Sequence, residues 1–485
     1  MLSLLAIAHV LGSLLMVFSA TFLLPMGWSI AEGDGTFPSF LAAAALTLGI
    51  GTALWLAGRG HGRELQPRDG CVLVVTGWMS MAALGAVPLM MELPGLSFTD
   101  AFFESISGLT ATGATVLTGL DAMPHGVNVW RHALSWYGGM GIIVLAVAIL
   151  PLIGVGGMQL FRAETPGPMK EGRLAPRIAQ VARYLWLVYV GLTALCVLAL
   201  RAVGMDWYDA VCHAFSAASL GGFSTRDASV AAFDSPAVEA VLMAFMLIAV
   251  LNFSTHFMAL RQRTPRPYLR DPEALPVLGL IVGSCLLLAA FLHEQGIYDD
   301  YGTALRFASF NVISLATTTG LVSADYDTWP MFASMWLLFL CAVSSSAGST
   351  GGGIKMIRAL LLVKQARREL VRLVHPRAIN PLTLGGALVD NKVIFAVLGF
   401  MLLYGFTLAV VAFALLATGL DLTTALTATI ASVNNTGPGL ARVGPTQTYA
   451  FLSDFQTWLL AFAMLAGRLE LLTVFALFLP SFWRR

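Results

Sequence analysis

The hydrophobic pattern of this chain is a series of long apolar runs separated by short polar connections. A transmembrane helix needs about 20 consecutive apolar residues, and about ten runs reach that length. They begin near Leu4, Leu41, Cys71, Leu134, Leu185, Val238, Leu275, Met331, Val393 and Trp458. The first run has no basic start and no small-residue cleavage pattern, so we interpret it as a retained span rather than a signal peptide.

Four shorter helical stretches lie between the long runs. At about 1.5 Å per residue, each falls short of a hydrocarbon core of about 30 Å, so each must enter and leave on one side. They are predicted over Phe98–Leu109, Trp207–Ala218, Gly302–Ala316 and Leu422–Val433. Residue types that cap helix N-termini stand at their starts: Thr99-Asp100, Asp206, Asp299-Asp300, and Asp421 with Thr423-Thr424.

Each short helix leads into a turn of small residues that ends in glycine. The turns are Thr110–Gly113, Leu220–Gly222, Thr317–Gly320 and Asn434–Gly437, and their regular recurrence indicates repeated structural units. A ring of backbone carbonyls can replace the hydration shell of a monovalent cation. An isolated turn of this kind would more often mark close helix packing. Four of them after capped short helices favour a selectivity filter.

We assign the ion ligands to the backbone carbonyls one and two residues before each glycine, because small residues allow those carbonyls to point inward. The predicted ligands are Ala111, Thr112, Leu220, Gly221, Thr318, Thr319, Asn435 and Thr436. The filter glycines that complete the turns are Gly113, Gly222, Gly320 and Gly437.

Composition excludes a soluble globular protein. Hydrophobic residues make up 57% of the 485 residues and charged residues 11%, whereas soluble domains carry about 25% charged residues. We expect an all-α polytopic membrane protein with four pseudo-repeated units, each an outer helix, a pore helix, a filter turn and an inner helix, around a central pore. The predicted divisions are an N-terminal transmembrane hairpin over 1–66 and pore repeats over 67–175, 176–275, 276–385 and 386–485.

Charge patterning orients these units. Most of the 28 Lys and Arg residues fall in alternate connections, including Arg59–Arg68, Arg162–Arg183, Arg261–Arg270 and Lys355–Lys392. By the positive-inside rule these connections face the cytoplasm, which places both termini there and the four turns outside. Most of the 27 acids lie on outward connections. They either form a negative vestibule that concentrates cations or merely mark connections that tolerate acids, and the sequence leaves both open.

The third inner helix is expected to differ from the other three, because its apolar run from Met331 breaks at Ser344–Gly353 before resuming to about Leu373. A glycine-rich break at membrane depth must face protein or a water-filled cavity. Just under the filter it would obstruct the pore, which makes it a candidate gating loop; a kink that serves only helix packing is the alternative. The predicted loop residues are Ser345, Ser346, Ala347, Gly348, Ser349, Thr350, Gly351, Gly352 and Gly353.

Arg468 stands inside the apolar run Trp458–Leu479, where a charge costs at least about 2.5–3.5 kcal/mol and usually serves function. A structural salt bridge to another helix is the alternative. Glu470 points to a different helix face, so spacing implies no pair with Arg468. We interpret His213 as a hydrogen-bonded packing residue, and the five cysteines, which lack metal-type spacing, as packing residues too.

The chain resembles the Trk/Ktr/HKT superfamily of potassium uptake proteins, and within it the bacterial TrkH type. Besides the four turns, the resemblance rests on Gly138–Val147, Gly156–Pro168 and Ala347–Lys355. It implies a K⁺ pore in the bacterial inner membrane, a homodimer with one pore per protomer, and a TrkA-like cytosolic ring that binds nucleotide. It also implies that Arg468 lines the pore below the filter. The second turn departs from the pattern, since Leu220-Gly221 lacks the hydroxyl or amide of the others, which argues against very high K⁺ over Na⁺ discrimination.

We therefore expect a gated, channel-like K⁺ uptake protein, with a coupled K⁺/H⁺ or K⁺/Na⁺ symporter as the alternative. Coupled transporters usually show inverted repeats around broken helices, whereas these repeats all start on the same side. No catalytic motif predicts an enzyme, and no organic cofactor or nucleic acid is expected. Gly348–Lys355 lacks the spacing of a phosphate-binding loop, so nucleotide control requires a partner. The basic connections Arg261–Arg270 and Lys364–Arg377 fit a regulatory subunit or anionic lipid equally well.

Overall fold

The computed structural model describes residues 4–60, 66–148, 174–377 and 380–484. The Gly156–Pro168 stretch, with Arg162 inside it, and the nearby Lys170 and Arg173 lie outside the described residues. The described chain is almost entirely helical, which confirms the expected class. A two-stranded antiparallel ribbon, β1 (Thr383–Leu384) with β2 (Ala387–Leu388), precedes the last repeat.

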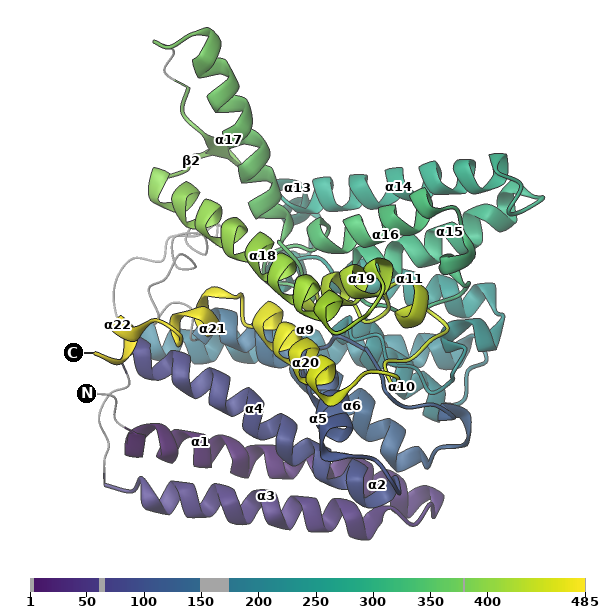
Figure 1. Ribbon diagram of the computed structural model, residues 1–485, viewed down its shortest axis with the longest axis vertical. Coiled ribbons are helices and arrows are strands. Elements are labelled where there is room, and N and C mark those ends of the chain that lie inside the picture. Colours follow the sequence, from purple (N-terminus) through teal and green to yellow (C-terminus); the bar gives the residue numbers. More distant parts are fainter. Residues whose placement is uncertain (1–3, 61–65, 149–173, 378–379, 485) are drawn as a thin grey trace.

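An N-terminal hairpin flanks the body of the molecule (Figure 1). α1 (Leu4–Ser19) continues through a short 3₁₀ turn into α2 (Leu23–Glu32), and α3 (Phe37–Ala57) returns beside it. The two long helices approach closely at Gly12, where an added Cβ would lie 2.5 Å from the Gly51 carbonyl oxygen. Such small-residue contacts hold helices together in membranes, where the lipid is as apolar as the side chains.

Four groups of helices follow the hairpin. The outer helices are α4 (Pro67–Glu92), α9 (Leu174–Ala202), α14 (Ala274–Glu294) and α18 (Asn391–Ala417). The short helices are α5 (Phe98–Leu109), α10 (Trp207–Ser219), α15 (Tyr301–Ala316) and α19 (Leu422–Val433). The inner helices are α6 (His125–Ala148), α11 (Pro236–Ala249) with α12 (Phe253–Gln262), α16 (Met331–Val343) with α17 (Met356–Val374), and α20 (Asp454–Arg468) with α21 (Leu472–Ala476). α13 (Arg266–Arg270) and α22 (Pro480–Trp483) are short helices, one before α14 and one at the C-terminal end of the described chain.

All four short helices form within a residue or so of their predicted bounds. Asp206, Asp300 and Asp421 cap three of them by accepting a backbone N–H from the first turn. The first helix has its predicted bounds, but its predicted cap at Thr99-Asp100 was wrong, because Ser97 is the N-cap and Asp100 lies inside the first turn. The Thr303 backbone N–H lowers the pKa of Asp300, and the Thr424 backbone N–H does the same for the pKa of Asp421. Both caps are therefore charged at neutral pH.

Six helices in the described residues are long and apolar enough to cross a membrane, and the bent pair α11–α12 makes a possible seventh. The prediction that only the third inner helix is broken was wrong. α11 and α12 meet at 94°, and α20 ends at Arg468, after which Glu470 and Leu471 take positive φ angles. Neither break contains Gly or Pro, and the only helix-start signal in them is Asn252, which caps α12 by accepting from the Ser254 N–H.

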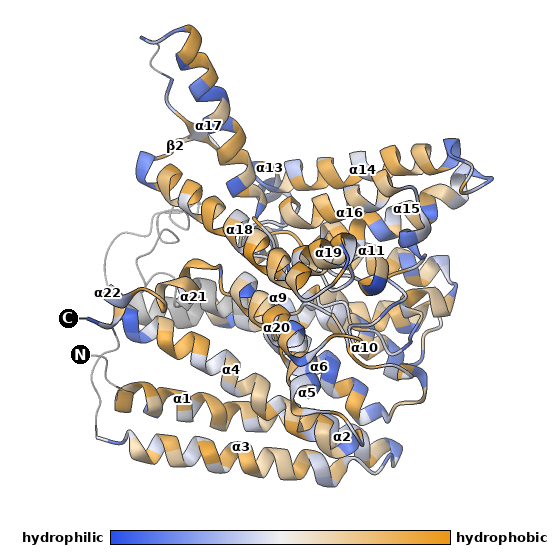
Figure 2. Ribbon diagram, in the orientation of Figure 1, coloured by the Kyte–Doolittle hydropathy of each residue, from blue (hydrophilic) through white to orange (hydrophobic). Residues whose placement is uncertain are grey.

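Two large apolar clusters form the core. One joins the N-terminal hairpin to the first and fourth groups of helices, through residues such as Phe22, Phe103 and Leu460. The other joins the second and third groups, through residues such as Leu242, Leu288 and Phe310. Large apolar side chains also cover the outside of the long helices, for example Val17 and Leu402, and Figure 2 shows hydrophobic colour along them. An apolar exterior of this kind suits contact with lipid.

Candidate functional site

The four glycine-ended turns share one backbone conformation. In each turn the residue two before the glycine is left-handed, with φ of 49°, 57°, 61° and 54° at Ala111, Leu220, Thr318 and Asn435. Each filter glycine also has positive φ, between 72° and 92°. In each turn the N–H of the residue before the glycine donates to a carbonyl five residues earlier; the pairs are Thr112–Ser107, Gly221–Ser216, Thr319–Ser314 and Thr436–Ala431. Four different sequences thus form the same turn.

The turns pack against one another in a closed ring. A Cβ on Gly113 would lie 2.5 Å from the Gly221 carbonyl oxygen, and one on Gly437 would lie 2.6 Å from that of Thr112. Added Cβ atoms on the other two filter glycines would come even closer to the next turn: Gly222 against the Thr319 carbonyl and Gly320 against the Thr436 carbonyl. Real Cβ atoms essentially never come within 3.0 Å of such atoms. Each glycine is therefore required by the carbonyl of the following turn.

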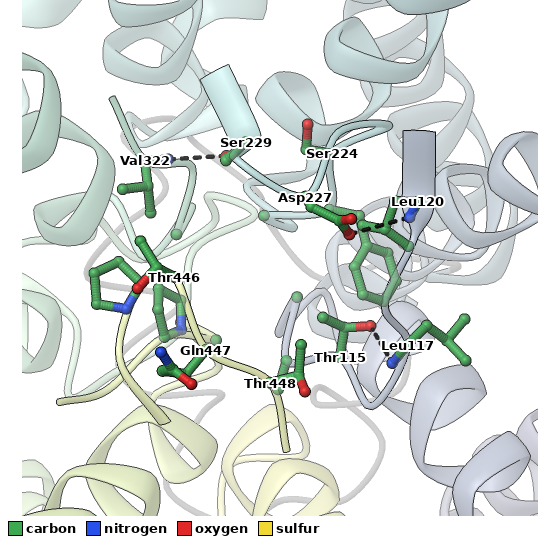
Figure 3. A pocket seen from close by; sticks show the side chains of 18 of the residues that line it. Thr115, Leu117, Leu120, Ser224, Asp227, Ser229, Val322, Thr446, Gln447 and Thr448 are labelled. Atoms are coloured by element: carbon green, nitrogen blue, oxygen red, sulfur yellow. Dashed lines mark hydrogen bonds between the residues drawn. The ribbon is translucent and has the colours of Figure 1, made fainter. Parts of the chain in front are cut away.

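A cavity of about 310 Å³ lies at the mouth of this ring, and all four filter glycines line it. Figure 3 shows Thr115, Ser224, Thr446 and Gln447 around it, from three of the four groups of helices. Among the residues that line the cavity, Asp227 is the only carboxylate, beside Arg131 and Arg226. The sequence left open whether the outward acids form a negative vestibule, and this wall, with one acid and two arginines, does not form one.

A buried ion pair supports the first turn from behind. Arg131 Nε donates to Glu104 Oε1 at 2.7 Å, and neither side chain is more than 1% exposed. Glu104 also accepts from the Thr115 hydroxyl and the Val116 N–H, just after the turn. The Arg131 guanidinium lies 4.3 Å from the ring centroid of Phe223, which follows the second turn. The pair therefore holds two turns in register, and its remaining hydrogen bonds offset the cost of burying charge.

In three of the four units, the residue nine positions before the filter glycine forms a hydrogen bond to a hydroxyl in the segment after the turn. Glu104 bonds to Thr115, His213 Nε2 to the Ser224 hydroxyl at 3.0 Å, and Asn311 Nδ2 to the Ser323 hydroxyl at 3.2 Å. In the fourth unit Thr427 does this work, accepting from the Leu440 N–H. His213 is thereby confirmed as a hydrogen-bonded packing residue. We call these four residues struts. Sequence reasoning missed the other three, although a nearly constant distance from the filter glycine was a usable signal.

Polar contacts also join neighbouring units at the outer rim. Asp227 accepts from the Gly119 and Leu120 N–H groups, and Ser229 accepts from Val322 N–H at 3.1 Å (Figure 3). Asp327 accepts from Ala441 N–H, and the Tyr449 N–H donates to the Thr115 carbonyl. These four contacts link unit one to two, two to three, three to four and four back to one. The rim is therefore closed in the same order as the ring.

The predicted gating loop lies directly against the inner side of the turns. Gly352 N–H donates to the Thr318 hydroxyl at 2.9 Å, and the Thr350 hydroxyl donates to the Ala218 carbonyl at 3.1 Å. Gly352 also packs so closely on the Asn434 carbonyl that a Cβ would clash there. The loop thus contacts the second, third and fourth units at once, in the position expected of an obstruction under the filter.

Arg468 points its charge into the same loop. The side chain is 3% exposed, and its guanidinium donates to the Thr350 carbonyl at 2.7 Å and the Gly138 carbonyl at 3.2 Å. Within the described ranges no carboxylate pairs with it, so the salt-bridge alternative is wrong there. Glu470 instead pairs with Arg358 at 2.6 Å. Arg468 therefore joins the fourth inner helix to the loop of the third unit and to the first inner helix.

No cluster of His, Cys, Asp or Glu suited to a metal ion occurs in the part of the chain that the structure describes. The five cysteines are buried and unpaired, as expected of packing residues. Backbone carbonyls and hydroxyls therefore dominate the polar chemistry of the ring, which suits a weakly held monovalent cation.

Comparison with known proteins agrees with this architecture. The family TrkH, described as cation transport proteins, matches residues 37–485. The chain belongs to the TrkH family. A Trk system potassium uptake protein TrkH from Salmonella typhimurium is 45% identical over 480 residues, 99% of each chain, and its Escherichia coli K12 counterpart is 43% identical over the same share. A crystal structure of the potassium transporter TrkH from Vibrio parahaemolyticus matches with a TM-score of 0.92 at 40% identity, covering 99% of this chain and 100% of that one.

Membership of the TrkH family confirms the resemblance stated from the turns. It makes this chain a multi-pass membrane protein of a transport family, in keeping with its six or seven candidate spans.

Removing one partner of the buried Glu104–Arg131 pair will test whether Glu104 supports the first turn. Glu104→Ala leaves Arg131 charged and unpaired, so we expect a loss of about 3–5 kcal/mol of stability, measured by thermal or denaturant unfolding in detergent. Glu369→Ala is the matched control, because Glu369 pairs with Arg372 at the surface and an exposed pair contributes about 0–1 kcal/mol. Equal stability of the two variants would contradict the supporting role of Glu104.

Proposed function

We propose that this chain carries K⁺ into a bacterial cell through the ring of four turns, which acts as its selectivity filter. The observation that carries the proposal is the closed ring, in which each filter glycine packs on a carbonyl of the next turn. The names of the TrkH relatives as potassium uptake proteins support K⁺ as the transported ion. The proposed ligands are the carbonyls assigned from the sequence, at Ala111 and Thr112 and the equivalent positions of the other turns.

We propose that the loop from Ser345 to Gly353 is the gate. It contacts three of the four units on the inner side of the turns, so an ion that leaves the filter meets it first. The loop is held by hydrogen bonds to neighbouring elements rather than by a continuous helix. A segment of this kind can move without unfolding the helices on either side.

We propose that Arg468 sets a barrier to cations below the filter. Its charge is buried, its two terminal nitrogens donate to backbone carbonyls, and no carboxylate in the described chain pairs with it. A fixed positive charge in a region of low dielectric raises the energy of a nearby cation. Because Arg468 also bonds to Thr350, the barrier and the gate share one contact.

The proposed setting follows the family pattern: the bacterial inner membrane, a homodimer with one pore per protomer, and a TrkA-like nucleotide-binding ring in the cytosol. The N- and C-terminal ends lie on the same side of the molecule (Figure 1), and the Arg68 side chain bonds to the Arg484 carbonyl there. This arrangement supports cytoplasmic placement of both termini. α17, with its basic residues, projects from the body (Figure 1) and offers a surface to a subunit or to anionic lipid.

The filter is tested by growth of a K⁺-uptake-deficient bacterium on low K⁺. Gly113→Ser places a side chain against the Gly221 carbonyl and strains a positive φ, and overpacking of this kind costs about 1–3 kcal/mol. We expect K⁺ influx to fall by about tenfold or more. Gly279→Ser is the control, because nothing lies within 4 Å of a Cβ there. Full rescue by Gly113→Ser would refute the filter, and unitary currents in single-channel recordings would exclude the symporter alternative.

The barrier is tested by Arg468→Ala. Removing a like charge that opposes the ion by about 1–2 kcal/mol should raise K⁺ influx about tenfold and weaken its voltage dependence, measured in reconstituted liposomes. Arg468→Lys keeps the charge without the planar fork, so it should retain most of the barrier. Unchanged flux and voltage dependence in Arg468→Ala would sink the barrier role.

A further inference from the structure

The carboxylate of Glu273 binds both ends of the intramembrane loop. Its Oε1 accepts from the Ala347 N–H at 3.0 Å and from the Ile357 N–H at 2.8 Å, and its Oε2 lies 3.1 Å from the same Ala347 nitrogen. Ala347 begins the glycine-rich part of the loop, and Ile357 follows it in the first turn of α17. One side chain thus fixes where the loop leaves and where it rejoins the helix.

Glu273 lies at the boundary between the second and third groups of helices. It stands immediately before α14, the outer helix of the third unit, and its own N–H donates to Asp271 Oδ1 at 2.9 Å. Asp271 Oδ2 in turn accepts from the Thr255 hydroxyl of α12 at 2.7 Å. The backbone of Glu273 is therefore linked through Asp271 to the bent second inner helix. It is 1% exposed, and neither the filter nor Arg468 uses it.

The bend between α11 and α12 makes further bonds to the loop. The Val250 carbonyl accepts from the Ser346 N–H at 3.1 Å, and the Phe253 N–H donates to the Gly348 carbonyl at 3.1 Å. These bonds and those of Glu273 place the loop on the second inner helix and the start of α14. A loop that moved away from the filter would have to break them.

Burial raises the pKa of the Glu273 carboxyl to about 7, and in its ionised form this side chain makes the strongest bonds of this set. Hydrogen bonds to an ionised acceptor are roughly twice as strong as neutral ones. Lys355 lies on the other side of the loop, where its ammonium donates to the Gly351 carbonyl at 2.7 Å. A buried carboxylate is costly unless it is paired or fully hydrogen-bonded, and these acceptor contacts are directed at the loop. The N–H groups that satisfy this carboxylate belong to the irregular segment between α16 and α17 and to the first turn of α17.

We propose that Glu273 is the latch that keeps the intramembrane loop in its obstructing position, a positioning residue for gating that acts through the loop and never contacts the ion. The proposal rests on the gate described under the proposed function. It assigns the release of the gate to the junction of α12, α13 and α14, where the bent second inner helix and the outer helix of the third unit meet.

The test compares Glu273→Gln with Glu294→Gln in the full-length protein in liposomes. Glutamine keeps the size of the side chain but loses the charge, so we expect K⁺ influx about fivefold or more above the parent, because one or two weakened bonds shift a two-state equilibrium by such a factor. Glu294→Gln makes the same change at the other end of α14 and should leave influx unchanged. The preference for K⁺ over Na⁺ should stay that of the parent in both variants, since neither residue contacts the ring.

A second measurement reads the loop itself. Ser349→Cys places a thiol on the loop, where Ser349 is buried and the five native cysteines are buried as well. A membrane-impermeant thiol reagent should modify this cysteine several times faster when Glu273→Gln is added to it. If Glu273→Gln does not reach the membrane, Glu273→Asp keeps the charge but shortens the reach, and the same increase in modification rate is expected of it.

Influx and thiol modification that both equal the parent's would overturn the latch. Faster modification without faster influx would show that the loop is latched but does not gate, which would overturn the proposed gate and the gating role of Glu273 together. If the parent protein carries no K⁺ in liposomes, that result counts against the proposed function. The rate of thiol modification would still report on the latch. The two failures are therefore distinguishable.

Discussion

The rest of this structure depends on the contact between each filter glycine and a backbone carbonyl of the following turn. That contact leaves no room for a Cβ at four positions, and it brings four carbonyls together around one opening. Three features near it keep the contact in place: a capped short helix behind each turn, a strut nine or ten residues before each glycine, and a rim of polar contacts in the same order. The ring is small, and the supports around it come from every unit of the chain.

The supports show how one geometry can be built from unrelated chemistry. A carboxylate paired with arginine, an imidazole, an amide and a threonine hydroxyl all hold the segment after the turn. Exact symmetry is unnecessary because each strut needs only to satisfy one or two backbone or hydroxyl groups at the right distance. The ionised strut at Glu104 is the most demanding of the four, since it brings a buried arginine with it, and that arginine reaches the second turn.

The sequence predicted the short helices and the four turns almost to the residue, because length, caps and glycine spacing are local signals. It also placed the loop of the third unit and singled out Arg468. It failed at the breaks after Ala249 and Arg468, since Val250–Asn252 and Glu470–Leu471 contain no Gly or Pro, and the cap residue Asn252 is a weak signal on its own. Partners far apart in the chain, such as Glu273 with Ala347 or Arg358 with Glu470, were likewise out of reach, because nothing local records a contact between units.

The hydrogen bond from Gly352 to the Thr318 hydroxyl has a consequence for how ion and loop affect each other. While the loop is in place, one lone pair of that oxygen is committed to the loop, so a cation that used it from the inner side would have to compete. Two events that exclude each other at one atom are linked thermodynamically, and the linkage is reciprocal. A cation bound at that hydroxyl oxygen would then increase the population of the withdrawn loop. Withdrawal of the loop would increase the affinity for that cation by the same factor.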